Sequence, residues 1–499
     1  MRKSLPSDAF LAPFDVSQFS LLPTLISFSN DIVSSFPPKS ILLQRTNCRS
    51  LLRKLELFSV LLESLKESDV DFSPTMFLCL NELLLVLHRS KILIDYCARS
   101  TKIWLLIQSQ TVSGYFHDLN QEIFTLLDVF PRKEIGLNDD VSEMVELLRR
   151  QGERSRIYVD EHDELLKTEL LAFYDAFENE TTPDEDSVRR FFVDRLMMKN
   201  ACDLRSEIEF LEEQIANQDG ASEPSGSVLH GLVAIARYAR FLIFGFEESN
   251  EETLIELPEN CVSIPKDLCC PITLELMKDP VVVSTGQTYD RTAITRWVEE
   301  GHTSCPKTGQ VLSDTRFVSN RALRNVIYEW CVANGISYEQ YENVEGNQME
   351  SAGKAAVQAN KATVCLLVRQ LGGGSDRAKA VSAREVRMLA KSGRENRALI
   401  GEAGAIPLLR DLLSSSNAAA QENSVTAMLN LSIYENNKGK IIEEDKCLAA
   451  IVSVLNGGLS TEARENAAAT LFSLSAVHEY KKRIGKEKGA VEALAGLLR

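Results

Sequence analysis

Ile264–Trp330 reads IPKDLCCPITLELMKDPVVVSTGQTYDRTAITRWVEEGHTSCPKTGQVLSDTRFVSNRALRNVIYEW, and this stretch decides the fold of the middle of the chain. Within it, Pro280–Tyr289 combines a β-branched run, a Thr-Gly turn and a second extended piece, which predicts a β-hairpin. Asp290 can cap a following helix because its carboxylate can accept the free amides of the first turn, and Asn320 can cap a second helix. We therefore expect a compact α/β module of about 70 residues.

The two helices of this module have predictable ends and one predictable buried face. Gly301 and Gly335 stand where the first and the second helix should stop. In the second helix, apolar residues recur at three- and four-residue steps, which indicates one buried stripe. The stripe consists of Leu323, Val326, Ile327, Trp330 and Cys331.

Two short motifs, Cys270-Pro-Ile-Thr273 and Cys305-Pro-Lys-Thr308, each resemble half of a zinc knuckle with threonine in place of the second thiolate. The hairpin between them, Ser284–Arg291, contains no cysteine or histidine, so a cross-braced zinc site would lack most of its ligands. We predict no bound metal. Hydrogen bonds should instead hold the loops, and their expected side-chain partners are Thr273, Ser284, Thr285, Thr288 and Thr308.

The cysteines of the module are candidates for a catalytic thiol, but no accompanying His–Asp or His–Asn pair is evident in the sequence. We interpret Cys269, Cys270 and Cys305 as small core residues.

Upstream of the module, residues 15–246 carry amphipathic helical patterns. Breaks rich in proline, glycine and small polar residues fall at residues 36–40, 178–187 and 217–227. These features predict a helical bundle. The most apolar run, Val228–Phe246, is interrupted by Arg237 and Arg240, so we interpret it as a buried helix and not as a membrane span.

Downstream of the module, the chain repeats itself. Ala420–Ser432 (AQENSVTAMLNLS) resembles Ala463–Ser475 (ARENAAATLFSLS), about 43 residues later. An all-helical repeat of this length is typical of armadillo and HEAT solenoids. The last apolar stripe, within Val491–Leu498, would have no next layer to cover it, which favours either an array cut short or a short form with its own cap.

The composition narrows the class of protein. The 499 residues carry a net charge of −16, which disfavours a general binder of nucleic acid or anionic membranes. Eleven cysteines are scattered without a dense framework, which indicates a reducing compartment. The N-terminus, MRKSLPSDAFLAPF, lacks the continuous apolar run of a signal peptide.

The central stretch resembles a U-box, the zinc-free relative of the RING finger, through its DPV, GxTYDR, CPxTG and N-x-x-L-x-x-x-I-x-x-W segments. The whole architecture is similar to that of the plant U-box/armadillo-repeat ubiquitin ligases. The fold class expected is mainly α, with a helical N-terminal domain, a small α/β U-box and a C-terminal armadillo solenoid. The expected boundaries are 1–246, a linker at 247–263, the U-box at 264–338, a linker at 339–356, and about three armadillo repeats at 357–499.

The resemblance implies a RING-type ubiquitin transferase that forms no covalent intermediate with ubiquitin and needs no cofactor. A conjugating enzyme carrying ubiquitin would bind two loops and the central helix of the U-box. Carried over by motif, its contacts are Ile272, Leu274, Trp297 and Pro306. Gln310 is a candidate for positioning ubiquitin. Trp297 is equally consistent with a core position, and Cys270, Thr273, Asp290, Cys305 and Thr308 are expected to be structural.

Either the solenoid or the N-terminal domain is expected to recruit protein substrates. The groove positions that correspond to peptide-clamping asparagines in armadillo proteins are Met388, Asn430 and Ser473, so only Asn430 has the expected side chain. The alternative function is a non-catalytic adaptor, and a homodimer through the U-box is also open. The resemblance further suggests the cytoplasm or nucleus of a plant cell, in defence, stress or hormone signalling.

Overall fold

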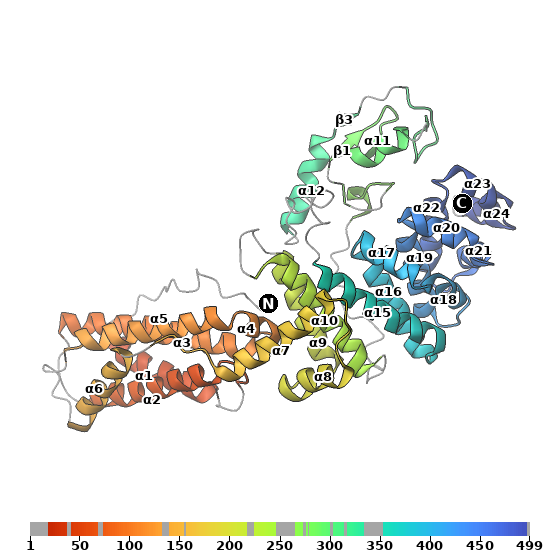
Figure 1. Cartoon of the computed structure of the whole chain (residues 1–499). Helices are drawn as coiled ribbons and strands as arrows, with labels where there is room; N and C mark the ends of the chain where they lie inside the picture. Colours follow the sequence, from red (N-terminus) through yellow and green to blue (C-terminus); the bar gives the residue numbers. More distant parts are fainter. Residues whose placement is uncertain are drawn as a thin grey trace. The chain divides into compact units, whose positions relative to one another are not determined.

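The structure is a computed structural model that describes residues 18–36, 41–67, 73–131, 139–153, 156–216, 224–245, 265–272, 276–277, 279–299, 303–313, 317–333 and 353–496. Helices dominate these residues, and one small β-sheet lies in the central module (Figure 1). The chain divides into two compact units: Met1–Asp175 with Pro183–Gln214, and Ala176–Thr182 with Ile215–Arg499. The mainly α fold class predicted from the sequence is therefore confirmed.

The first unit is a bundle of helices whose apolar stripes face inward. Leu51, Leu55 and Leu62 of the second helix are all buried, as the periodicity predicts. Ser73 caps the third helix by accepting a hydrogen bond from the Met76 amide at 3.2 Å. The elements are α1 (Gln18–Ser35), α2 (Arg45–Glu67), α3 (Pro74–Arg99), α4 (Lys102–Ile107), α5 (Ser109–Val129), α6 (Asp139–Glu153), α7 (Glu161–Glu178), α8 (Glu185–Arg189), a π-helical turn (Arg190–Arg195) and α9 (Ala201–Ala216).

A buried polar cluster ties α7 to the turn before α2. Gln44, whose φ is 55°, donates its backbone amide to the Asp163 carboxylate at 2.7 Å. The Gln44 side chain donates to the Ser109 carbonyl at 3.1 Å. Because burial removes water from the carboxylate, the pKa of Asp163 rises to about 6 although the Gln44 amide opposes the shift.

The central module contains a three-stranded antiparallel sheet in the order β2–β1–β3. β1 (Pro280–Val282) pairs with β2 (Thr288–Asp290), with Val281 opposite Tyr289, so the predicted hairpin is confirmed. Gly286 in its turn has a φ of 77°, a conformation that favours glycine. The other elements are a 3₁₀ turn (Lys266–Leu268), α11 (Arg291–Glu299), β3 (Val318–Ser319) and α12 (Arg321–Ala333).

The helix expected after Asn320 is confirmed, since the Asn320 side chain accepts the Leu323 amide at 3.0 Å. Its predicted stripe is only partly right. Ile327 is buried, and Leu323 and Trp330 pack against the core. Val326 is 54% exposed, because one narrow face of α12 suffices to cover so small a core. Gly301, Gly335 and the Cys331 side chain lie outside the described residues.

The C-terminal part is a solenoid in which the long helices α19 and α22 each follow two shorter helices, whereas α16 follows the longer helix α15. Gly404, with a φ of 78°, caps the start of the helix that precedes α19. The long helices α16, α19 and α22 pack side by side. The elements are α15 (Lys354–Gly373), α16 (Asp376–Lys391), α17 (Arg394–Glu402), α18 (Ala405–Leu412), α19 (Ala418–Ser432), α20 (Glu435–Glu443), α21 (Cys447–Gly457), α22 (Thr461–Leu474), α23 (His478–Lys486) and α24 (Ala490–Gly496).

In the last helix, Ala490 and Ala493 are buried and Leu494 packs against the solenoid core, whereas Val491 is 56% exposed. Leu497 and Leu498, which the sequence placed in the same apolar stripe, lie outside the described residues. Part of the stripe is therefore covered by α21 of the preceding repeat and by α23.

Helix α10 (Gly226–Phe244) packs against α15, so the second unit includes a helix that the predicted boundaries put in the N-terminal domain. Phe241 joins the solenoid core, and Arg240 forms a buried ion pair with Glu385 of α16 at 3.2 Å. By length and composition α10 is the one described helix that could cross a membrane, but most of its residues are buried here by protein. Helices α10, α15 and α16 thus form the first layer of the solenoid.

Candidate functional site

The core of the central module is organised around Tyr289, which is fully buried on β2. Its hydroxyl lies 3.0 Å from the Cys305 sulfur and accepts the Lys307 amide at 3.0 Å. On the same strand the Asp290 amide donates to the Cys270 sulfur at 3.3 Å. The hairpin therefore holds both Cys-Pro loops through the two thiols.

The environment of Cys305 changes its acidity. Burial alone would raise the pKa of the thiol, but the surrounding hydrogen-bonding groups of Thr285, Thr308 and Tyr289 lower it to about 7. The side chain is buried nonetheless, so the polarised sulfur serves the loop and is not open to a large electrophile.

A charge network fastens the hairpin to both helices. The Asp279 carboxylate pairs with Arg291 of α11 at 2.5 Å and with Arg324 of α12 at 2.6 Å. Asp290 accepts the Asp279 amide at 3.1 Å with one carboxylate oxygen, and the Thr292 amide and hydroxyl with the other. These contacts anchor the first turn of α11 and fix its direction.

The second Cys-Pro loop closes on itself. The Cys305 amide donates to the Gln310 carbonyl at 2.8 Å, and the Gly309 amide donates to the Cys305 carbonyl at 2.8 Å. Gly309 has a φ of 69°. Thr308 accepts the Gln310 amide at 3.4 Å, and the Gln310 side chain is exposed. A rigid turn therefore presents Gln310 to solvent.

Three of the four predicted docking residues are described, and each is half-buried. Ile272 and Trp297 pack against the module core, and the Trp297 indole donates to the Ser304 carbonyl at 2.8 Å. That bond brings Trp297 to the loop that carries Pro306. Trp297 thus combines a core contact with a surface contact, and Leu274 lies outside the described residues, as does Thr273.

Two of the hydroxyl groups expected to hold the Cys-Pro loops, those of Ser284 and Thr288, accept hydrogen bonds from other segments of the module. Ser284 accepts the Ser313 amide at 3.1 Å. Thr288 accepts the Asn320 side-chain amide at 3.2 Å, which links β2 to the start of α12.

Asn430, the candidate peptide clamp on the solenoid, already has a hydrogen-bond partner within the solenoid. Asn430 of α19 donates its side-chain amide to the Arg387 carbonyl of α16 at 3.1 Å. The Ser473 hydroxyl lies 2.8 Å from that of Ser432, and Met388 is 43% exposed. The polar groups at these positions therefore join successive long helices to one another.

Comparison with known families accounts for all three parts of the chain. Residues 264–336 match the U-box domain, residues 45–156 match the PUB10-like N-terminal domain, and residues 393–433 match an armadillo/beta-catenin-like repeat. U-box domain-containing protein 17 of Arabidopsis thaliana is 54% identical over 494 residues, which cover 92% of this chain and 68% of that protein. The chain belongs to the plant U-box/armadillo-repeat ubiquitin ligase family.

Two further relatives extend the similarity over nearly the full chain. U-box domain-containing protein 4 of Oryza sativa subsp. japonica is 42% identical over 93% of this chain and 66% of its own length. U-box domain-containing protein 16 of Arabidopsis thaliana is 37% identical over 99% of this chain and 73% of its own length. The chain thus spans about two thirds of the length of these relatives.

Sequence reasoning missed two organising residues of the U-box, Tyr289 and Asp279. Both stand inside segments that carried the resemblance, GxTYDR and DPV, so their positions in the motif were a usable signal. Among the described residues no group of three or more His, Cys, Asp or Glu side chains could hold a metal ion. The zinc-free U-box stays a prediction that metal analysis of the purified protein can check.

Proposed function

We propose that this chain is a ubiquitin-protein ligase whose U-box binds a ubiquitin-charged conjugating enzyme and promotes direct transfer to a substrate lysine. The observation that carries the proposal is a partly exposed apolar surface on rigid loops. Ile272, Trp297 and Pro306 keep part of their surface open, while the loops beneath them are closed by hydrogen bonds. Such a preorganised surface loses little entropy when a partner binds.

Direct transfer fits the state of the two Cys-Pro thiols, whereas the neighbouring Cys269, expected in the core, is only half-buried. Cys270 and Cys305 are both buried and engaged in hydrogen bonds, so neither could form a thioester with ubiquitin without unfolding its loop. The contribution of the U-box is then orientation: it would hold the conjugating enzyme and its ubiquitin so that the incoming lysine meets the thioester in a reactive geometry. Gln310, exposed on its rigid turn, can add a hydrogen bond to that complex.

The helical parts would supply the substrate. The solenoid offers a continuous surface of long helices, and the N-terminal bundle offers a second one. Because Asn430 is bonded to Arg387, a ladder of asparagine clamps along an extended peptide is disfavoured. We propose that the groove reads a folded surface or an amphipathic helix.

The test is an autoubiquitination assay of the full chain against a panel of conjugating enzymes. Ile272→Lys should abolish transfer because it places a charge in the docking surface. The matched control is Val318→Lys, at a position of β3 that is 67% exposed and carries none of the predicted docking residues. Pro306→Ala should weaken transfer more mildly, since it trims only part of the contact.

Ile272 also packs against the core, so the melting temperature of each variant must be measured beside its activity. Full activity in Ile272→Lys would overturn the docking surface. If the wild-type chain transfers no ubiquitin with any conjugating enzyme, the non-catalytic adaptor is the better description.

Fluorescent fusions in plant cells would test the proposed location in cytoplasm or nucleus.

A further inference from the structure

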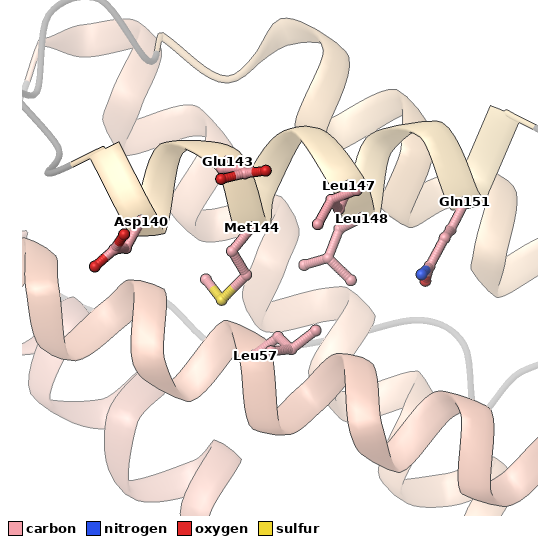
Figure 2. A pocket seen from close by; sticks show the side chains of 7 residues that line it. All are labelled: Leu57, Asp140, Glu143, Met144, Leu147, Leu148 and Gln151. Carbon is pink, nitrogen blue, oxygen red and sulfur yellow. The ribbon is translucent and has the colours of Figure 1, made fainter.

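The N-terminal bundle has a hollow of about 300 Å³ between α2 and α6 (Figure 2). Its apolar lining comes from Leu57 of α2 and from Met144, Leu147 and Leu148 of α6. Met144 and Leu148 point from α6 towards α2, where Leu57 lies. Leu148 is buried and forms the floor, whereas Leu147 is 53% exposed. A large apolar side chain therefore stands at the mouth of an apolar depression.

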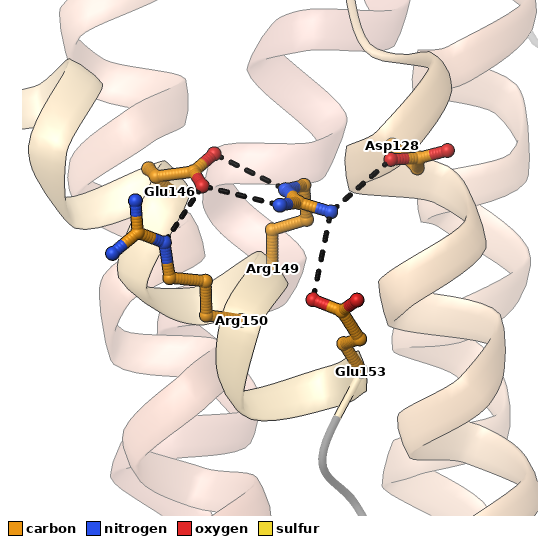
Figure 3. Close-up of polar contacts among 5 residues, drawn as sticks. All are labelled: Asp128, Glu146, Arg149, Arg150 and Glu153. Atoms are coloured by element: carbon orange, nitrogen blue, oxygen red, sulfur yellow. Dashed lines mark hydrogen bonds and ion pairs between the residues drawn. The ribbon is translucent and has the colours of Figure 1, made fainter.

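Helix α6 is held firmly from its other side. Arg149 makes two hydrogen bonds to Glu146, at 3.1 and 3.2 Å, and reaches Asp128 of α5 at 3.4 Å (Figure 3). Gly152 lies so close to α5 that an added Cβ would come within 2.6 Å of the Phe124 Cβ. Because α6 is anchored in this way, Leu147 is exposed while its helix stays in a fixed position.

The rim of the hollow is negatively charged. Asp140 and Glu143 are exposed and line it, and neither pairs with a basic side chain among the described residues. The carboxylates on the opposite side of α6 are different, since Glu146 and Glu153 both lie beside Arg149. Among the described residues, the unpaired carboxylates of α6 therefore lie in its N-terminal half, where Asp140 and Glu143 line the hollow and the exposed Asp139 stands beside them.

The negative charge of Asp140 and Glu143 limits which class of partner can bind at the hollow. Nucleic acid and anionic membranes would be repelled. A second copy of the chain is the competing occupant, and the sedimentation experiment below tests for it. The lining residues of α6 run from Asp140 to Gln151, about three helical turns or 16 Å. The described residues of this unit contain no β-strand whose edge could accept an extended peptide.

We propose that the α2–α6 hollow docks an amphipathic helix of a partner protein, with apolar residues at steps of three and four and lysine or arginine beside them. Its apolar stripe covers Leu147 and fills the depression, and its basic residues face Asp140 and Glu143. The inference goes beyond the ligase function and does not rest on it, because the binding test below contains no conjugating enzyme or ubiquitin.

The test uses two fluorescein-labelled synthetic helices of 18 residues, built on alanine with the same leucine stripe and with either lysine or glutamate flanking it. Fluorescence anisotropy with the full chain at low salt should show binding of the lysine peptide at least about tenfold tighter than of the glutamate peptide. Leu147→Gln should weaken the lysine peptide about fivefold or more. Leu165→Gln, at an exposed leucine of α7 in the same unit, should leave binding unchanged.

Charge reversal separates a specific site from general attraction to an acidic chain. The double variant Asp140→Lys with Glu143→Lys should reverse the preference towards the glutamate peptide. The matched control is Glu209→Lys with Glu213→Lys on α9, which alters net charge equally at two exposed positions. Equal weakening by both double variants, no effect of Leu147→Gln, or no binding of the lysine peptide would overturn the proposal. A dimer in sedimentation that Leu147→Gln dissociates would show that the occupant is a second copy.

Discussion

At the scale of single residues, the U-box depends on groups that bond across its core. Tyr289 is the clearest case, because one hydroxyl serves both a thiol and a backbone amide of the second Cys-Pro loop. Removing one partner from a buried hydrogen bond leaves the other without water or protein to replace it.

Tyr289→Phe should therefore lower the free energy of unfolding of the U-box by about 1–3 kcal/mol. Ubiquitin transfer should fall as the Pro306 loop loosens. Tyr158→Phe, at an exposed tyrosine, is the control. Denaturant unfolding of both variants measures the difference, and equal stability would show that the hydroxyl contributes little.

Asp163 gives the N-terminal bundle a pH dependence whose sign follows from its raised pKa. The folded state holds the proton more tightly than the unfolded state, because the pKa of Asp163 rises from its ordinary value of 3.8 to about 6 on folding. The contribution of Asp163 to the free energy of unfolding is therefore fully present below the unfolded-state pKa of 3.8. It is lost as the pH rises through about 6, and the loss is at most about 3 kcal/mol.

Asp163→Asn should flatten the stability profile of the bundle between about pH 4 and 6, because the amide oxygen can still accept the Gln44 amide without titrating. Unfolding at several pH values measures the slope. Asp118→Asn, at an exposed position of α5, should keep the wild-type profile. An unchanged slope in Asp163→Asn would assign the dependence to other groups.

At the scale of elements, the attachment of α10 to the solenoid stands out. Arg240 and Glu385 are nearly inaccessible, at 7% and 12% side-chain exposure, and Arg240 also lies over the Phe241 ring at 4.7 Å. A buried pair of this kind contributes modestly as a whole, but losing one partner leaves a charge in an apolar interior.

Arg240→Ala should destabilise the second unit by about 3–5 kcal/mol. The double variant Arg240→Met with Glu385→Leu should recover most of that loss, because it leaves no unpaired charge. Thermal unfolding of the three proteins compares them. A single variant as stable as the wild type would mean that water reaches the site.

At the scale of the whole molecule, the two compact units should unfold separately, since each has its own core. Calorimetry of the full chain should resolve more than one transition. Asp163→Asn should move only the transition of the N-terminal bundle, and Arg240→Ala only that of the unit containing the solenoid. A single transition that both variants shift would show that the units unfold together.

Many of the secondary-structure elements and the repeat of the solenoid were predictable because they depend on local sequence patterns. The β-branched run around Gly286 predicts the hairpin, the Asn320 cap predicts α12, and the repeated Ala420–Ser432 segment predicts the solenoid. Each depends on neighbours in sequence or on a period that the chain displays directly. The U-box motif also located the loops that carry Ile272 and Pro306.

Only the tertiary structure decided which faces meet. The composition of α10 makes it a buried helix, but nothing in its sequence says that it packs against α15. Asn430 has the side chain of a peptide clamp, yet a neighbouring helix places the Arg387 carbonyl within its reach. Val326 fits the apolar period of α12 and still faces solvent. The reason is common to all three: periodicity determines which side of an element is apolar, whereas burial and bonding depend on what folds against that side.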